Sequence, residues 1–196
     1  MKEQIINSSL QQFLQQGIRK TTVQKLITPL GISTKTFYKY FADKEDILTH
    51  CVLRHYAELS KRLSSLEGET RDPLLAMVEL WRQAIVLDFG VNHIFYYDLN
   101  YYYPKIQDSV LRKFSSKYIG LLSRLTASCI RMGYFRKEII PALVPKIISI
   151  LYSSITRTGE FKSFRLSTDQ LMQNTIDPYI RGICTGKGLK TLSKII

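Results

Sequence analysis

The sequence is poor in residues that interrupt helices and in residues that cross-link small folds. Only 10 glycines and 6 prolines occur in 196 residues, so long helices are possible. The cysteines are odd in number and far apart, at Cys51, Cys129 and Cys184. This distribution argues against a disulfide framework and favours buried free thiols in a reducing compartment.

Long apolar runs are also missing. No stretch of about 18 apolar residues occurs, so no transmembrane helix is expected. Residues 1–17 have a helical period in place of the continuous apolar segment of a signal peptide. We therefore expect a cytoplasmic protein that has no membrane partner.

Motifs for catalysis and metal binding are absent. The histidines, His50, His55 and His93, lack the spacing of metal ligands. The sequence contains no nucleophile elbow, no phosphate-binding loop and no glycine-rich dinucleotide loop. We therefore predict no enzyme activity, no bound metal and no cofactor.

Positive charge is in excess. The formal net charge is +12, from 28 Lys and Arg against 16 Asp and Glu. This balance suits a polyanionic partner such as nucleic acid, or an anionic ligand or membrane surface. In the segment 17–44, Asp43 is the single acid among six basic residues, namely Arg19, Lys20, Lys25, Lys35, Lys39 and Lys44.

Apolar residues recur every three to four positions through most of the chain, which is the period of amphipathic α-helices. The sequence predicts an all-α fold of about nine helices, divided near residue 45 into segments 1–45 and 46–196. The later helices are expected near 74–89, 106–133, 141–158 and 168–184. The stretch 67–73 is expected to be a loop, and the tail after Gly186 is expected to be frayed.

Residues 17–48 have the outline of a helix-turn-helix. Gly17 can end a first helix, Thr22 can cap a short second helix, Gly31 allows a tight turn and Ser33 can cap a third helix. The small core between these helices would be filled by Val23, Leu26, Leu30, Ile32 and Phe37. Polar side chains on the third helix would then be free to reach base edges and phosphates in a major groove.

The combined pattern resembles the DNA-binding domain of TetR-family regulators. The matching residues are Gly17, Thr21-Thr22, Gly31-Ile32-Ser33, Phe37-Tyr38, Tyr40-Phe41, Lys44-Glu45 and Leu48. The resemblance implies base contacts from Thr34 and Lys35, and phosphate contacts from Thr22, Thr36, Tyr38 and Lys44. The full candidate DNA-binding set is Thr22, Ser33, Thr34, Lys35, Thr36, Tyr38, Lys39 and Lys44.

Four positions depart from the family pattern. Ile27 and Leu30 replace smaller residues, and Pro29 lies where the second helix should finish. These changes are expected to shift the end of that helix and to enlarge its core. Lys35 replaces a commonly small residue, which adds charge where bases or phosphates are read.

Aromatic residues in the middle of the chain suggest an effector pocket, because aromatic walls with polar tips suit small organic ligands. The candidates are Trp81, Tyr96, Tyr97, Tyr101, Tyr102, Phe114 and Tyr118. The same residues could instead form ordinary core or a dimer surface, and Trp81 alone is more typical of core.

These observations favour a TetR-like transcriptional regulator, with a helix-turn-helix at 1–45 and a helical effector-binding and dimerisation domain at 46–196. We expect a repressor that dimerises through the helices near 141–158 and 168–184, binds a near-palindromic operator, and is released by a small molecule. Two alternatives stay open: a helical small-molecule-binding protein or enzyme with vestigial DNA binding, and an architectural protein that binds DNA without sequence preference.

Overall fold

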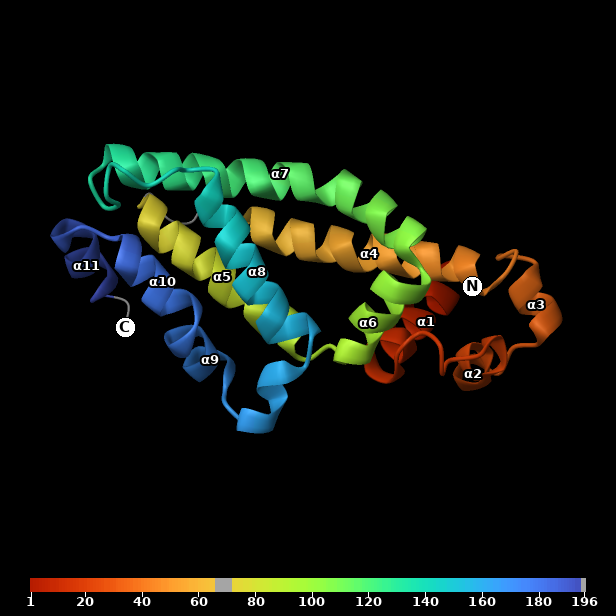
Figure 1. Cartoon of the computed structure of the whole chain (residues 1–196). Helices are drawn as coiled ribbons and strands as arrows, with labels where there is room; N and C mark the ends of the chain where they lie inside the picture. The colour runs from red at the N-terminus through yellow and green to blue at the C-terminus, as the bar shows by residue number, and fades with distance from the viewer. Residues whose placement is uncertain (66–71, 195–196) are drawn as a thin grey trace. The chain divides into compact units, whose positions relative to one another are not determined.

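The computed structural model describes residues 1–65 and 72–194 (Figure 1). Across these residues it contains eleven α-helices and two short 3-10 helices. The strand-like pairing found among them is one isolated bridge between Phe135 and Cys184. The predicted all-α class is therefore confirmed. Most of the loop expected at 67–73 lies outside the described residues.

The chain divides into two compact units. We call them the first unit, Met1–Leu59 with Val91–Phe114, and the second unit, Ser60–Gly90 with Ser115–Ile196. The long helices α4 (Lys44–Ser65) and α7 (Pro104–Arg131) each contribute residues to both units. The first unit therefore contains the predicted helix-turn-helix together with a segment from the middle of the sequence.

The first unit is built on amphipathic helices that share one core. Besides its parts of α4 and α7, it contains α1 (Lys2–Gln16), α2 (Val23–Ile27), α3 (Thr34–Tyr38) and α6 (His93–Tyr102). The helix α1 buries Ile5 and Phe13 because these residues recur on one face, and it ends at Gly17, whose φ of 83° is unfavourable for other residues. Leu26, Phe37 and Phe95 join the same core from three other helices.

The second unit surrounds one apolar helix. It contains α5 (Pro73–Phe89), α8 (Leu143–Arg157), α9 (Thr168–Asn174), α10 (Ile176–Ile183) and α11 (Gly186–Leu192). Asp72 caps α5 by accepting hydrogen bonds from the backbone N–H groups of Leu74 and Leu75. The helices α8, α9 and α11 all pack against α5 (Figure 1), which explains why its apolar residues are spread nearly all round.

One predicted helix is divided in two. The apolar stripe over 168–184 predicted a single helix, but the backbone at Thr175 leaves the helical region, with φ −130° and ψ −78°. Pro178 explains the break, because its ring would clash with the carbonyl of residue 174 and it has no N–H to donate. The stripe is kept on both pieces, where Leu171, Ile176 and Ile180 are buried.

The prediction of a frayed tail is wrong. Residues 186–192 form α11, which Thr185 caps by accepting a hydrogen bond from the N–H of Gly188. The hydroxyl of Thr185 also donates to the carbonyl of Gly133, and Lys187 donates to the carbonyl of Met132. These tertiary contacts hold a glycine-rich segment that has little helix propensity of its own.

Candidate nucleic-acid interface

The segment α2–turn–α3 is held in shape by hydrogen bonds at its helix ends. The hydroxyl of Thr22 accepts a hydrogen bond from the N–H of Lys25 (3.3 Å) and so caps α2. A 3-10 turn, Thr28–Leu30, follows and ends at Gly31 with φ 61°. Ser33 caps α3 by accepting a hydrogen bond from the N–H of Thr36 (3.1 Å). The predicted caps and turn are present, and α2 stops before Pro29 as its sequence indicated.

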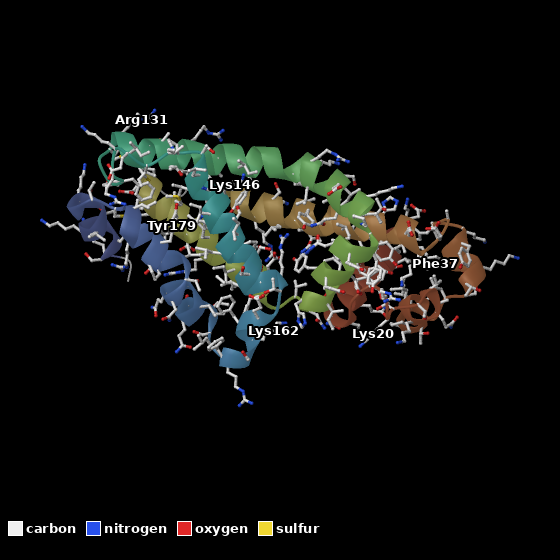
Figure 2. All side chains as sticks on the ribbon, viewed as in Figure 1. Lys20, Phe37, Arg131, Lys146, Lys162 and Tyr179 are labelled. Carbon is white, nitrogen blue, oxygen red and sulfur yellow. The ribbon has the colours of Figure 1, made fainter. Side chains whose placement is uncertain are left out.

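One face of α3 is fixed to the core. Phe37 is fully buried, and its ring lies 5.5 Å from that of Phe41 and 5.3 Å from that of Tyr38. Leu26 and Ile27 of α2 are buried in the same core, so the larger residue at position 27 is accommodated by full burial. Figure 2 labels Phe37 on α3. This anchoring determines which side of α3 faces solvent.

The opposite face of α3 presents the candidate DNA-binding residues. Thr34, Lys35 and Lys39 are exposed, and Thr36 is half-buried beside Ser33. Tyr38 is 55% exposed although its ring contacts Phe37. The structure therefore brings these five side chains together on one short helix and its end, while their contacts with DNA stay a prediction.

The start of α4 adds a further basic group. Lys44 is the first residue of α4 and is half-buried. Burial lowers the pKa of its ammonium group, while the charge of Asp98 acts in the opposite direction. The start of this helix is capped by Asp43, which accepts a hydrogen bond from the N–H of Asp46 (2.8 Å). The phosphate contact expected of Lys44 stays a prediction.

Basic residues just before and within α2 extend this surface and were not among the predicted contacts. Arg19, Lys20 and Lys25 are all exposed, and the Lys25 ammonium donates to the carbonyl of Lys20 (3.1 Å). Figure 2 labels Lys20 ahead of α2. The density of basic residues in segment 17–44 was the sequence signal for them.

The predicted effector residues fall into separate groups. In the second unit, the rings of Trp81 and Tyr118 are in edge contact, 5.7 Å apart. Trp81 is 1% exposed, and its indole N–H and the Tyr118 hydroxyl have no hydrogen-bond partner among the described residues. The ring of Tyr152 lies 5.8 Å from Trp81 and was not predicted. Its hydroxyl donates to the fully buried carboxylate of Asp88.

The other candidates lie in the first unit. Tyr97 and Tyr101 stack in parallel on the surface of α6, with ring centroids 5.7 Å apart, and Tyr102 is in edge contact with both. Tyr96 is fully buried and bonds through its hydroxyl to a ring nitrogen of His55. The side chain of Phe114 stacks on Tyr56. The predicted effector residues that belong to the first unit are Tyr96, Tyr97, Tyr101, Tyr102 and Phe114.

The described residues contain no group of three or more His, Cys, Asp or Glu side chains that could hold a metal ion. No helix in the described part of the chain is long and apolar enough to cross a membrane.

The family comparison decides the identity of the helix-turn-helix. Residues 5–51 match the model of the bacterial regulatory proteins of the tetR family. These residues form a TetR-family DNA-binding domain. The chain is a DNA-binding transcriptional regulator, and the matched residues include α2, the turn at Gly31 and α3.

Solved structures extend the likeness to the whole fold of the chain. A TetR/AcrR-family regulator from Thermobifida fusca is 21% identical, with 88% of this chain and 92% of that chain covered and a TM-score of 0.71. FadR from Bacillus subtilis, solved with stearoyl-CoA, is 17% identical over 93% of this chain and 100% of its own, with a TM-score of 0.74. A regulator from Saccharomonospora viridis, solved with choline, is 16% identical over 94% and 97%, with a TM-score of 0.77. No match was found among curated protein sequences.

Proposed function

We propose that this TetR-family regulator is a homodimeric repressor that binds a near-palindromic operator and is released by a small-molecule effector. Residues 1–45 would contact DNA, and 46–196 would bind the effector and form the dimer. The observation that carries the proposal is the exposed polar face of α3, held over the buried Phe37 and capped by Ser33. A rigid short helix with Lys35 on its outer face suits base reading better than a mobile basic segment does.

Unpartnered apolar side chains on α8 favour a dimer. Leu143, Ile147 and Ile150 recur on one face of this helix and are exposed, Ile150 to 61%. The opposite face is buried, so α8 has apolar residues on two sides. Lys146 lies on α8 and Tyr179 on α10 (Figure 2). A two-fold partner using α8 and α10 would cover this stripe, as the prediction from sequence requires. Two recognition helices would then meet major grooves about 34–36 Å apart.

The aromatic group of the second unit is the candidate effector site. Two buried donors without partners, on Trp81 and Tyr118, would each gain a hydrogen bond from a ligand acceptor. The two neighbours solved with ligands bind chemically different molecules, an acyl-CoA and choline. Because those chains are under 25% identical to this one, neither ligand is transferred to it. The effector is instead to be sought by screening.

Selection from a random duplex pool at near-physiological salt tests the DNA-binding part. We expect a two-fold symmetric motif, which identifies a dimeric operator binder. Recovery of no motif with a folded protein would contradict specific binding by the protein alone. Recovery of unrelated sequences at equal affinity would instead identify an architectural DNA binder.

Three alanine variants then separate base contacts from phosphate contacts. Lys35→Ala should weaken binding to the selected duplex more than binding to an unrelated one. Lys44→Ala should weaken both equally and make the slope of log K against log salt shallower by about one. Lys162→Ala is the matched control, because Lys162 is an exposed lysine of the second unit (Figure 2). Equal effects of all three would mean that net charge alone acts.

The effector part has its own optical signal. Trp81 is the only tryptophan in the chain, so its fluorescence reports directly on the proposed site. A compound that changes this fluorescence and releases the selected duplex is the expected result of a screen. Tyr118→Phe should weaken that compound without changing DNA affinity in its absence. An unchanged response in Tyr118→Phe would contradict the assigned site.

A further inference from the structure

The helix α6 begins by capping the end of α1. The backbone N–H of Asn92 donates to the carbonyl of Leu14 (2.9 Å), and its side-chain amide donates to the carbonyl of Gln15 (2.8 Å). Carbonyls in the last turn of a helix have no partner within that helix. The Asn92 side chain also accepts a hydrogen bond from the N–H of Ile94, which caps α6 itself. One asparagine therefore joins the end of α1 to the start of α6.

A buried carboxylate in the middle of α6 holds the segment that follows α1. Asp98 is 4% exposed, and its Oδ2 atom accepts hydrogen bonds from the backbone N–H groups of Ile18 and Arg19, both at 2.8 Å. Residues 18 and 19 lie between α1 and α2. A buried carboxylate is costly unless it is compensated, so both N–H bonds are needed where Asp98 lies. The contact joins residues about 80 positions apart in sequence.

Gly17 allows this close approach. A Cβ atom at this position would lie 2.7 Å from Cγ2 of Ile94 and 3.1 Å from Oδ2 of Asp98. Its φ of 83° is also one that residues with a side chain rarely adopt. The backbone at Gly17 therefore packs directly on α6, and only glycine satisfies both conditions.

The last turn of α6 holds the side chain of the same segment. The guanidinium of Arg19 lies 4.2 Å from the ring centroid of Tyr102 and donates to the Tyr102 hydroxyl (2.8 Å). A guanidinium over a tyrosine ring is attracted to its electron-rich face. The N-cap of α6 and two residues of the helix, which together we call the α6 clamp, thus contact residues 14–19: Asn92, Asp98 and Tyr102.

The clamped segment leads straight into the helix-turn-helix. The hydroxyl of Thr21 donates to the carbonyl of Gly17 (2.7 Å), and its N–H donates to the carbonyl of Ile18 (3.2 Å). Thr22, the next residue, is the N-cap of α2. Two hydrogen bonds of Thr21 thus connect the clamped residues to the start of α2.

We propose that Asp98 is a positioning residue for DNA binding: through the α6 clamp it fixes the entry of the chain into α2 and so the orientation of α3. Asp98 itself touches no DNA in this proposal. A helix-turn-helix that is already oriented loses less conformational entropy on binding than one that must be ordered by the duplex. The inference rests on the DNA-binding function proposed above.

The central experiment compares Asp98→Asn with Asp108→Asn. Both variants replace an aspartate by asparagine and so change the net charge equally. Asp108 serves as the control because it is an exposed aspartate of the same unit. Binding to the duplex recovered by selection is measured over a range of salt concentrations. For Asp98→Asn we expect at least a tenfold loss of affinity with an unchanged salt slope, because the number of phosphate contacts is unchanged. Affinity equal to that of Asp108→Asn, or a changed slope, overturns the proposal.

A charge-conserving variant excludes a simple electrostatic effect. Asp98→Glu keeps the carboxylate but moves it by one methylene, so the bonds to Ile18 and Arg19 cannot keep their geometry. We expect a loss of affinity similar to that of Asp98→Asn. Wild-type affinity in Asp98→Glu would mean that only the charge matters, which contradicts positioning.

Hydrogen exchange provides a readout that does not need DNA. In Asp98→Asn the amides of Ile18 and Arg19 should exchange at least tenfold faster than in wild type, and they should be unchanged in Asp108→Asn. If wild type binds no duplex, the proposed function fails while this measurement still tests the clamp. If Asp98→Asn does not fold, Tyr102→Ala replaces it, because Tyr102 is an exposed member of the α6 clamp whose removal leaves the core intact. A severalfold loss of affinity at constant slope is then expected, and wild-type affinity overturns the proposal.

Discussion

The tie between α5 and α8 gives a stability prediction that can be worked out in detail. Asp88 of α5 is fully buried, and its carboxylate accepts a hydrogen bond from the hydroxyl of Tyr152. The guanidinium of Arg157 lies 3.4 Å from the same carboxylate oxygen and 5.5 Å from the Tyr152 ring centroid. Both partners belong to α8, so the perturbation to make is Asp88→Asn, which keeps the shape and removes the charge.

The size of the effect follows from the burial of each partner. Removing one member of a buried ion pair costs about 3–5 kcal/mol, because the other charge is left without compensation. Arg157 retains 17% exposure, so water can reach its guanidinium and the cost is smaller. We expect Asp88→Asn to lower the free energy of unfolding by about 2–3 kcal/mol. Tyr152→Phe removes one hydrogen bond and should cost about 1–3 kcal/mol.

Removing the cation should lower the free energy of unfolding more than removing the anion does. Arg157→Met removes the guanidinium that lies 3.4 Å from the fully buried Asp88 carboxylate, so we expect a loss of about 3–5 kcal/mol in the free energy of unfolding. The double variant Asp88→Asn with Arg157→Met removes both charges and should cost clearly less than the sum of the two single losses. This order of single and double variants is the signature of a buried pair.

Urea unfolding followed by fluorescence measures these differences. The only tryptophan, Trp81, lies 5.8 Å from the ring of Tyr152, so its signal reports on the unit that contains the pair. The burial of Tyr152 and the charge of Asp88 raise the pKa of its phenol, so the hydroxyl remains a donor through neutral pH. Losses in the two single variants that simply add in the double variant would refute the reasoning, since a coupled pair must be non-additive.

Three further predictions concern other parts of the molecule. Ser33→Ala should cost about 1 kcal/mol of stability through the lost α3 cap and should weaken binding to the selected duplex; unchanged binding would mean that α3 forms without its cap. Ile150→Glu should shift the protein to monomer in analytical ultracentrifugation, whereas Lys162→Ala should not; a dimeric Ile150→Glu variant would exclude the α8 stripe as the interface. Burial raises the pKa of the Cys184 thiol to about 11, so iodoacetamide should modify it at pH 8 about a hundredfold more slowly in the folded than in the unfolded protein. The free thiol of Cys184 therefore contributes its full stabilisation below about pH 8.5, and this contribution is lost as the pH rises through about 11. A modification rate that levels off near pH 9 would contradict this pKa.

The helix-turn-helix could be predicted from sequence because its determinants are local. Caps at Thr22 and Ser33 and the positive φ of Gly31 act within a few residues, so the spacing in the sequence already encodes them. The burial of Phe37 follows from the same short-range pattern. Which polar residues lie outward on α3 was therefore foreseeable, while their roles in DNA binding stay predictions.

The features that sequence reasoning missed depend on contacts far apart in the chain. Asp98 has no local motif, because its partners are the amides of Ile18 and Arg19. The helix α11 was missed because its glycines suggest a frayed tail. Gly188 is instead needed for a contact far away in the sequence, since a Cβ there would lie 2.3 Å from the carbonyl oxygen of Tyr134. The aromatic candidates looked like one cluster because they are close in sequence, yet Tyr97 and Tyr101 are exposed while Tyr96 is buried.

The α6 clamp has a consequence for building chimeric regulators. Exchanging residues 1–45 between relatives would separate Ile18 and Arg19 from Asp98, which accepts hydrogen bonds from their N–H groups. A grafted segment with any side chain at position 17 would collide with Ile94. A chimera designed to bind a different operator should therefore receive α6 together with the new helix-turn-helix. Alternatively, it should retain residues 14–19 of this protein and exchange only the residues that follow them.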